Sequence, residues 1–264
     1  MCKKLSVKVI LFLCLSVFGF SSYNAQAEYK EINVTNGGTI EGTVKWSGAT
    51  PEIQQFAVTK DKDHCAAETK PSPRLIISPS NNGVKDAVVY LVDIKEGKKI
   101  AGLSKPVMDQ IQCVYQPRMF VVPAGTEFEM TTSDDILHNI HMYGAATYNL
   151  AFPIKGQKIT KKLRKPGVVE LICDAGHYWM SAYVHVVEHP YYAITDENGK
   201  FGIDNVPPGT YKLQAWHEGW VIKEKQEKEG KPSKLIFTEP IVIEKEVKVD
   251  GNATVTVDFE LSGK

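Results

Sequence analysis

Four side chains in the second half of the sequence could bind a soft or borderline metal ion together. Cys173, His177 and Met180 fall within eight residues, and His138 precedes Cys173 by 35 positions. Two imidazoles and a thiolate in a roughly trigonal plane, with a weakly bound thioether, suit copper as Cu(I) and Cu(II). Zinc seldom binds methionine, and a structural zinc site would need pairs of closely spaced Cys or His ligands. The donor types therefore favour one copper ion.

Each candidate ligand could instead have an ordinary structural role that involves no metal. His138 could bond to the backbone of a turn, Met180 could fill a core, and Cys173 could be an inert buried thiol. His141 lies three positions after His138, and a strand places such positions on opposite faces, so we expect it to point away from a metal. We assign structural or surface roles to the remaining histidines: His64, His185, His189 and His217.

Residues 1–27 have the pattern of a signal peptide. Three lysines precede an apolar run over 9–20 that is too short to span a bilayer, and Ala25-Gln26-Ala27 offers the small side chains that signal peptidases accept. The alternative is a retained membrane anchor. We expect cleavage after Ala27, so that the mature chain starts at Glu28 and is periplasmic or secreted, without a membrane span.

The charge balance argues against a nucleic-acid partner. The sequence has 31 basic and 31 acidic residues, and removing the three lysines of the signal peptide leaves a small acidic excess. No basic stripe interleaved with aromatic residues is present. The run KEKQEKEGK over 223–231 alternates in sign, which predicts a solvated loop there.

The cysteine count is odd once the signal peptide is removed, with Cys65, Cys113 and Cys173 remaining. In an oxidising compartment the odd cysteine would be a free thiol, an intermolecular bridge or a metal ligand. A disulfide between Cys65 and Cys113 would leave Cys173 free to bind a metal. Three cysteines are too few for a typical iron–sulfur cluster.

The elements that must position these residues are strands. Residues 39–46 and 254–261 alternate apolar and polar side chains, as half-buried strands do, and helical periodicity is nearly absent. Turn sequences such as Asn198-Gly199 separate the strands, which predicts an all-β sandwich or barrel. The other expected strands cover 87–92, 118–122, 127–131, 168–173, 183–187, 211–216 and 241–249.

Residues 190–217 resemble the small β-sandwich called the carboxypeptidase regulatory-like, or transthyretin-like, domain. The resemblance rests on TDENGKFGI at 195–203 and VPPGTYKL at 206–213, with TIEGTV at 39–44 and AVVYL at 87–91 as the earlier strands of that family. The two halves are separated in the sequence.

This separation predicts a discontinuous arrangement of domains. Residues 37–105 together with 190–262 would form the regulatory-like sandwich, and a module over 106–189 would be inserted between them.

The inserted module resembles the plastocyanin-like cupredoxins. CVYQP at 113–117 and VVPAG at 121–125 are similar to the strand and turn that lead to the copper site, and His138-Asn139 stands where the family has its first histidine ligand. CDAGHYWM at 173–180 then supplies Cys, His and Met in the family's order. The resemblance implies a cupredoxin-like β-sandwich whose copper ligands are His138, Cys173 and His177, with Met180 as a weak axial ligand. In such a sandwich, the chain around His138 and the loop over 173–180 would emerge at the same end.

The spacing within this loop departs from the plastocyanin-like pattern, which has a shorter gap from Cys to His and a longer gap from His to Met. The spacing here is similar to the second half of the copper A loop of cytochrome oxidase subunit two. The first cysteine of that loop would fall at Val169. Valine cannot bridge two copper ions, so we expect a single copper.

A copper ion without an open coordination position suits outer-sphere electron transfer. We expect an extracytoplasmic mononuclear copper protein without enzymatic activity, whose partner is a redox protein such as a c-type cytochrome. The rival hypotheses are a non-redox binding or scaffold protein with a carbohydrate-binding-like sandwich, a copper chaperone or sensor, and an enzyme with an open copper site. Copper uptake, metal transfer to a chelator and the response to azide distinguish them.

Overall fold

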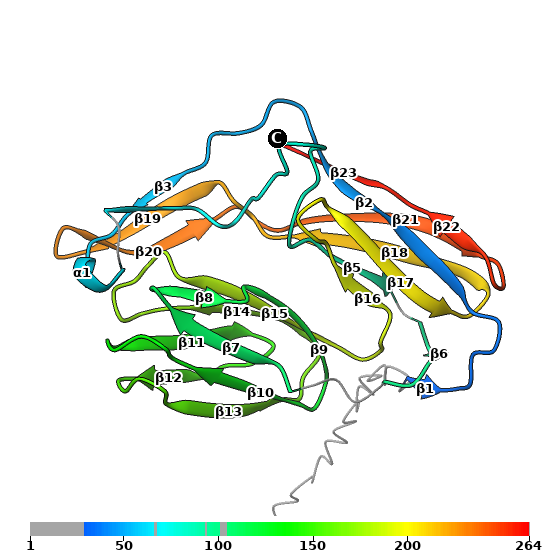
Figure 1. The fold of residues 1–264 in the computed structure, drawn as a ribbon, viewed down its shortest axis with the longest axis horizontal. Helices are drawn as coiled ribbons and strands as arrows, with labels where there is room; N and C mark the ends of the chain where they lie inside the picture. The colour runs from blue at the N-terminus through cyan, green and yellow to red at the C-terminus, as the bar shows by residue number, and fades with distance from the viewer. Residues whose placement is uncertain (1–28, 66–67, 93, 101–104, 264) are drawn as a thin grey trace, which may run out of the picture.

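Two β-sandwiches lie side by side in the computed structural model (Figure 1). The structure describes residues 29–65, 68–92, 94–100 and 105–263, so the expected signal peptide at 1–27 lies outside the described residues. Nearly all regular elements in the described part are strands, and α1 (Lys62–Cys65) is the one short α-helix there. The expected all-β class is confirmed.

The first sandwich consists of strands between residues 107 and 187, drawn in green in Figure 1. One sheet has the order β13-β10-β7-β8 and the other β12-β11-β14-β15-β9. Side chains from both sheets, such as Phe128 and Leu171, form one core. The strand bounds are β7 (Val107–Ile111), β8 (Val114–Gln116), β9 (Met119–Pro123), β10 (Thr126–Thr131), β11 (His138–Gly144), β12 (Asn149–Phe152), β13 (Lys158–Leu163), β14 (Gly167–Ile172) and β15 (Ser181–Val187).

The second sandwich combines strands from before and after the first one. One sheet has the order β16-β5-β18-β21, and the other places β2 between β17 and the pair β22 and β23. Its separate core contains Ile40, Leu91, Leu213 and Phe259. The strand bounds are β2 (Gly38–Ser47), β5 (Val88–Val92), β16 (Tyr192–Ile194), β17 (Lys200–Val206), β18 (Gly209–His217), β21 (Ile241–Val249), β22 (Thr254–Thr256) and β23 (Phe259–Ser262); the short β1 (Lys30–Glu31) and β6 (Glu96–Gly97) pair beside it.

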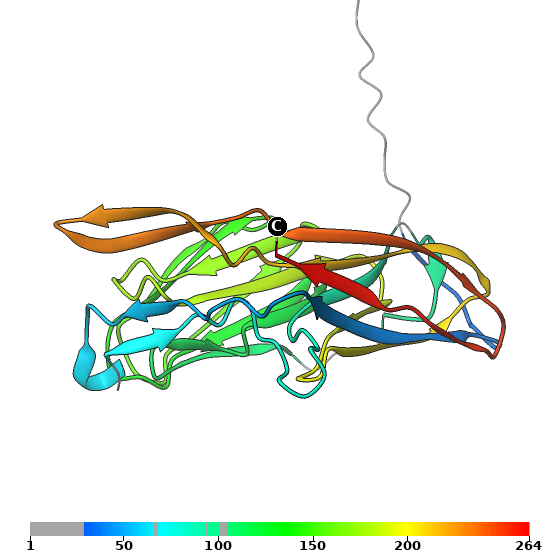
Figure 2. The ribbon, with the colours of Figure 1, turned by 90° about the horizontal axis from the view of Figure 1, so that it is seen from above.

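Two further strand pairs extend from the second sandwich over the first (Figures 1 and 2). They are β3 (Gln55–Ala57) with β4 (Thr69–Pro71), and β19 (Ile222–Lys228) with β20 (Lys231–Phe237). Phe56, Val58 and Cys65 are buried in the first core, and Phe237 packs against it.

The prediction of a loop at 223–231 is therefore wrong, because this run lies in the hairpin of β19 and β20. The alternation of charge in this run has the two-residue period of a strand. Glu229 and Gly230 have φ angles of 54° and 72°, which a tight hairpin turn requires.

Buried charges join the two sandwiches. Arg74 is 4% exposed and donates to Glu218 Oε2 at 2.8 Å and to the Tyr183 hydroxyl at 3.0 Å, while Arg118 donates to Glu218 Oε1 at 2.7 Å. Because Glu218 follows β18 and Tyr183 lies in β15, this network connects both sandwiches. A buried ion pair of this kind adds little net stability, because the loss of hydration of both charges offsets their attraction, but removing one partner would leave a buried charge unpaired.

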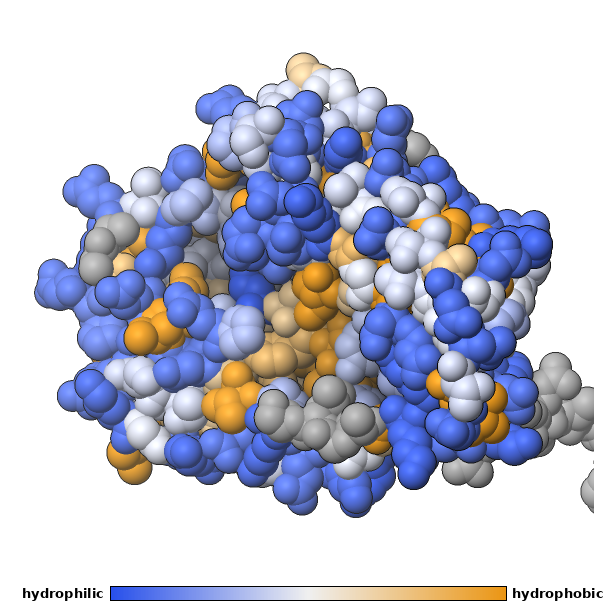
Figure 3. Space-filling model, turned by 45° about the vertical axis from the view of Figure 1, so that its right-hand side comes forward, coloured by the Kyte–Doolittle hydropathy of each residue, from blue (hydrophilic) through white to orange (hydrophobic). Residues whose placement is uncertain are grey.

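A cleft of about 230 Å³ lies between the sandwiches, lined by residues of β5 and β15 among others. On the face shown in Figure 3, hydrophobic side chains gather in a hollow with hydrophilic borders. His185 lines this cleft and contacts Trp216 edge to face, with ring centroids 4.4 Å apart.

Burial of His185 should make the free energy of unfolding depend on pH. Burial lowers the pKa of His185 to about 4, whereas an unfolded chain has a histidine pKa of about 6.5. Between these values the unfolded state binds more protons, so the free energy of unfolding should fall as pH drops from about 6.5 towards 4. Urea unfolding near pH 7 and near pH 5 measures this loss. His185→Phe removes the titrating ring, so the loss of stability between the two pH values should be smaller in this variant. An equal loss in the wild type and the variant would contradict the prediction.

Candidate metal centre

Strand alternation brings His138 and Cys173 to the same place. His138, Ile140 and Met142 lie on the inward face of β11, and all three are 0% exposed. Val169 and Leu171 are the inward residues of β14, so Cys173 continues their row just after the strand ends. β11 and β14 are antiparallel neighbours with His141 opposite Ile172. Cys173 is thus brought to the end of β11 that carries His138.

The loop from Cys173 to Met180 turns back to begin β15 and carries His177 inward. Gly176 has a φ of +99°, a backbone angle that favours glycine. The Met180 N–H donates to the His177 carbonyl at 2.9 Å, which closes a turn. Asn139 ties this loop to β11, because its side-chain oxygen accepts from the Asp174 N–H at 2.9 Å.

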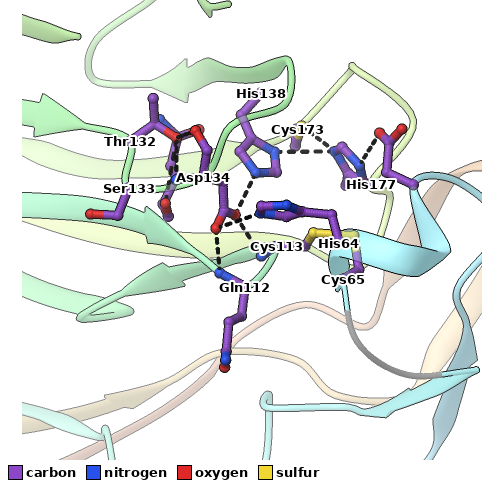
Figure 4. A network of polar contacts seen from close by, with 12 residues as sticks. His64, Cys65, Gln112, Cys113, Thr132, Ser133, Asp134, His138, Cys173 and His177 are labelled. Carbon is purple, nitrogen blue, oxygen red and sulfur yellow. Dashed lines mark hydrogen bonds and ion pairs between the residues drawn. A yellow bond between two sulfur atoms is a disulfide. The ribbon is translucent and has the colours of Figure 1, made fainter. Parts of the chain in front are cut away.

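The donor atoms of His138, Cys173 and His177 converge (Figure 4). The two Nδ1 atoms are 3.2 Å apart, and Cys173 Sγ is 3.7 Å from His177 Nδ1. The three donor atoms lie within 4.8 Å of one another. Bonds of about 2.0 Å to nitrogen and 2.3 Å to sulfur, as around zinc, would place the donor atoms of one metal roughly 3 to 4 Å apart. The arrangement therefore fits a single metal ion.

The centre is closed to solvent. His138 and His177 are 0% exposed and Cys173 is 2% exposed. Burial lowers the pKa of both imidazoles, that of His177 to about 4 with the neighbouring His138 adding to the effect. Neutral rings keep a lone pair for a metal. Burial also raises the pKa of the Cys173 thiol, although backbone N–H groups oppose this, so a bound cation would have to favour the thiolate.

Asp134 holds the far side of the His138 ring. Its Oδ2 lies 2.8 Å from His138 Nε2, and its Oδ1 lies 3.0 Å from His64 Nε2. The N–H groups of Gln112 and Cys113 also donate to this carboxylate, at 2.7 and 2.8 Å. Burial acts to raise the pKa of Asp134, but these hydrogen bonds outweigh it and lower the pKa. His138 Nε2–H thus donates to an ionised carboxylate, which leaves Nδ1 free to bind a metal.

Asp61 lies against Nε2 of His177, as Asp134 does against Nε2 of His138. Its Oδ2 lies 2.9 Å from His177 Nε2, across 116 positions of sequence. The carboxylate comes from the turn before α1, where the Cys65 N–H donates to the Asp61 carbonyl at 2.9 Å. Cys65 is joined to Cys113 in a disulfide with a Cα–Cα distance of 5.3 Å, and Cys173 is the free cysteine among the described residues.

The structure brings together three of the four expected ligands, and Met180 lies close to them in the chain. Met180 is 1% exposed and belongs to the same buried cluster as Cys173 and Trp179. His141 lies on the outward face of β11 and pairs with Asp174.

Sequence reasoning missed Asp61, Asp134 and the contact of His64. A local pattern could have identified Asp134 as a partner of His138, because it stands four residues before His138 in an acidic turn. Asp61 lies in a polar segment far from every ligand in sequence, so no local pattern marked it.

The chain is similar to solved cupredoxins over about a third of its length. A purple cupredoxin from Nitrosopumilus maritimus has 20% identity and a TM-score of 0.28, and covers 31% of this chain and 99% of its own. A reduced Cu(I) form of an amicyanin mutant has 21% identity and a TM-score of 0.29, covering 33% and 87%. The copper-containing nitrite reductase of Thermus scotoductus has 19% identity and a TM-score of 0.30, covering 38% of this chain and 25% of its own.

A family model described as polysaccharide lyase family 4, domain II, matches residues 176–229. This range starts in the loop of the candidate metal centre and ends in the hairpin of β19 and β20. No curated protein matches the chain.

Proposed function

We propose that this chain is a mononuclear copper protein that transfers electrons by an outer-sphere route. His138, Cys173 and His177 would hold the copper, with Met180 as a weak axial ligand. Copper would supply a one-electron change between Cu(II) and Cu(I). The side chains would supply the rest: two neutral imidazoles, a cysteine sulfur that ionises when the metal binds, and a pocket closed to solvent.

The convergence of two Nδ1 atoms and one Sγ in a buried pocket is the observation that carries this proposal. Both Nε2 atoms are held by carboxylates, so neither ring needs to turn when the metal is oxidised or reduced. Ligands that stay in place suit electron transfer, because little reorganisation accompanies it.

Metal analysis together with a visible spectrum of the oxidised protein tests the proposal. The expected result is one copper per chain and an intense thiolate-to-copper absorption band. Protein that takes up no copper would contradict the proposal and favour a non-redox scaffold. Rapid loss of copper to a dilute chelator would favour a chaperone, and a spectral shift with azide would favour an enzyme with an open site.

Met180→Leu should keep the copper and its colour while raising the reduction potential. A thioether in the axial position stabilises Cu(II) weakly, so removing it makes the protein a stronger oxidant. A redox titration followed through the visible band measures the change. Loss of copper from the variant, or an unchanged potential, would remove Met180 from the ligand set.

We propose that the mature protein works in the periplasm or outside the cell. Among the described residues, no helix is long and apolar enough to cross a membrane. N-terminal sequencing of the natural protein should find Glu28 as the first residue. Full-length chain in the membrane fraction would contradict this prediction. A soluble redox protein, such as a c-type cytochrome, is the partner that such a location suits.

We also propose that residues 37–105 with 190–262, and residues 106–189, are the two structural units of the chain. The separate cores support this division. Two segments are exceptions, the one around Phe56 to Cys65 and the hairpin of β19 and β20, because both pack on the other unit.

A further inference from the structure

Residues 57–65, here called the capping segment, cover the loop that carries His177. Lys60 Nζ donates to the Ala175 carbonyl at 2.5 Å, and the Tyr178 hydroxyl donates to the Ala57 carbonyl at 2.9 Å. A Cβ atom added to Gly176 would lie 2.8 Å from Lys60 Cδ, so the Lys60 side chain lies directly against the backbone of this loop. The capping segment therefore lies directly against the candidate metal centre although it precedes the first sandwich in sequence.

Three anchors hold the capping segment in place. The disulfide attaches Cys65 to Cys113, which follows β7 in the first sandwich. Val58 is 1% exposed within the core of that sandwich. His64 pairs with Asp134, the carboxylate that also holds His138. A segment anchored on both sides of Asp61 can present that carboxylate at a fixed position.

The position of Asp61 determines the state of the His177 ring. His177 Nδ1 faces Cys173 and His138, and Nε2 faces Asp61. A carboxylate accepts a hydrogen bond, so the ring carries its proton on Nε2 and keeps the lone pair of Nδ1 for a metal. The negative charge next to the ring also makes Nδ1 a stronger donor.

We propose that Asp61 is a positioning residue for the copper centre and that the capping segment seals it. This inference rests on the proposed function. Asp61 fixes the tautomer and orientation of His177, and its charge stabilises Cu(II) more than Cu(I), because the attraction grows with the charge of the ion. The capping segment keeps water and chelators from the His177 side, so copper is retained.

Asp61→Asn and Asp63→Asn make a matched pair for the test. Both remove one negative charge from the capping segment, but Asp63 is exposed and lies two residues from Asp61. Asp61→Asn should lower Cu(II) affinity about 10- to 100-fold, as the loss of such carboxylate partners does. A tenfold greater loss for Cu(II) than for Cu(I) would raise the potential by about 59 mV. Asp63→Asn should match the wild type in both measurements.

The measurements are the potential and the rate of copper removal by a chelator. Faster removal and a higher potential in Asp61→Asn alone would support the inference. Equal values in the two variants would overturn it while leaving the proposed function in place.

A copper-free measurement separates this inference from the proposed function. Nitrogen NMR of the metal-free protein should show His177 protonated on Nε2 in the wild type and in Asp63→Asn. In Asp61→Ala, the preference for this tautomer should be lost. If the wild-type protein bound no copper, the proposed function would fail, and the tautomer would still decide whether Asp61 positions His177. A tautomer unchanged in Asp61→Ala would overturn the role of Asp61.

Discussion

Cys173→Ser is expected to abolish the thiolate-to-copper absorption band and to cause the largest loss of function of any single change. Cys173 Sγ lies 3.7 Å from His177 Nδ1 and is almost fully buried. A serine hydroxyl is nearly the same size, but it ionises far less easily and donates less charge to Cu(II). The serine side chain would occupy the position of the cysteine, but the donation of charge from sulfur to copper would be lost. A visible spectrum and metal analysis of the purified variant measure the effect.

Met142→Leu is a suitable control, because Met142 is equally buried on the inward face of β11 but belongs to no candidate ligand set. A change of one apolar side chain for another of similar volume should leave the band intact. If Cys173→Ser bound copper and absorbed light like the wild type, the copper assignment would be wrong, and the scaffold hypothesis would take its place.

Loss of the disulfide has the second largest expected effect. Cys65 and Cys113 are 48 positions apart, and closing a loop of that size stabilises a protein by about 4 kcal/mol in the chain-entropy model. The double variant Cys65→Ala with Cys113→Ala should therefore unfold at a much lower urea concentration. Urea unfolding of copper-free protein followed by tryptophan fluorescence measures the difference.

Reductant provides the control for the disulfide variant. Reduction should shift the wild type to nearly the urea midpoint of the double variant and should leave the double variant unchanged. A wild-type midpoint that did not respond to reductant, in protein shown to contain free thiols, would contradict the assigned stabilisation.

Much of the fold could be predicted because alternation and turn chemistry act locally. The strand expected at 241–249 coincides with β21, and the one expected at 168–173 differs from β14 by one residue at each end. His138, Cys173 and His177 could be proposed together because a strand end and a single short loop carry them. Local patterns were sufficient where neighbouring strands determine the geometry.

The contacts that could not be predicted are those made between distant segments. Asp61 reaches His177 only because the pair β3 and β4 leaves the second sandwich and packs on the first. The hairpin of β19 and β20 was missed because its exposed charges resemble those of a loop, while only a few apolar residues mark its packed side: Ile222, Leu235 and Phe237. Such contacts depend on how whole units meet, which the sequence pattern of one segment does not encode.

The order of the three described cysteines has a consequence for biosynthesis. A chain made from its N-terminus presents Cys65 first, Cys113 second and Cys173 last. If the chain enters an oxidising compartment from its N-terminus, as we propose, oxidation of the first two as they emerge would give the observed disulfide before the third is available to compete. The thiol of Cys173 would then be spared by the order of emergence, and slow reshuffling of a wrongly paired intermediate would be avoided. A rearranged gene that moved Cys173 ahead of Cys113 would lose this protection even if its folded product were unchanged.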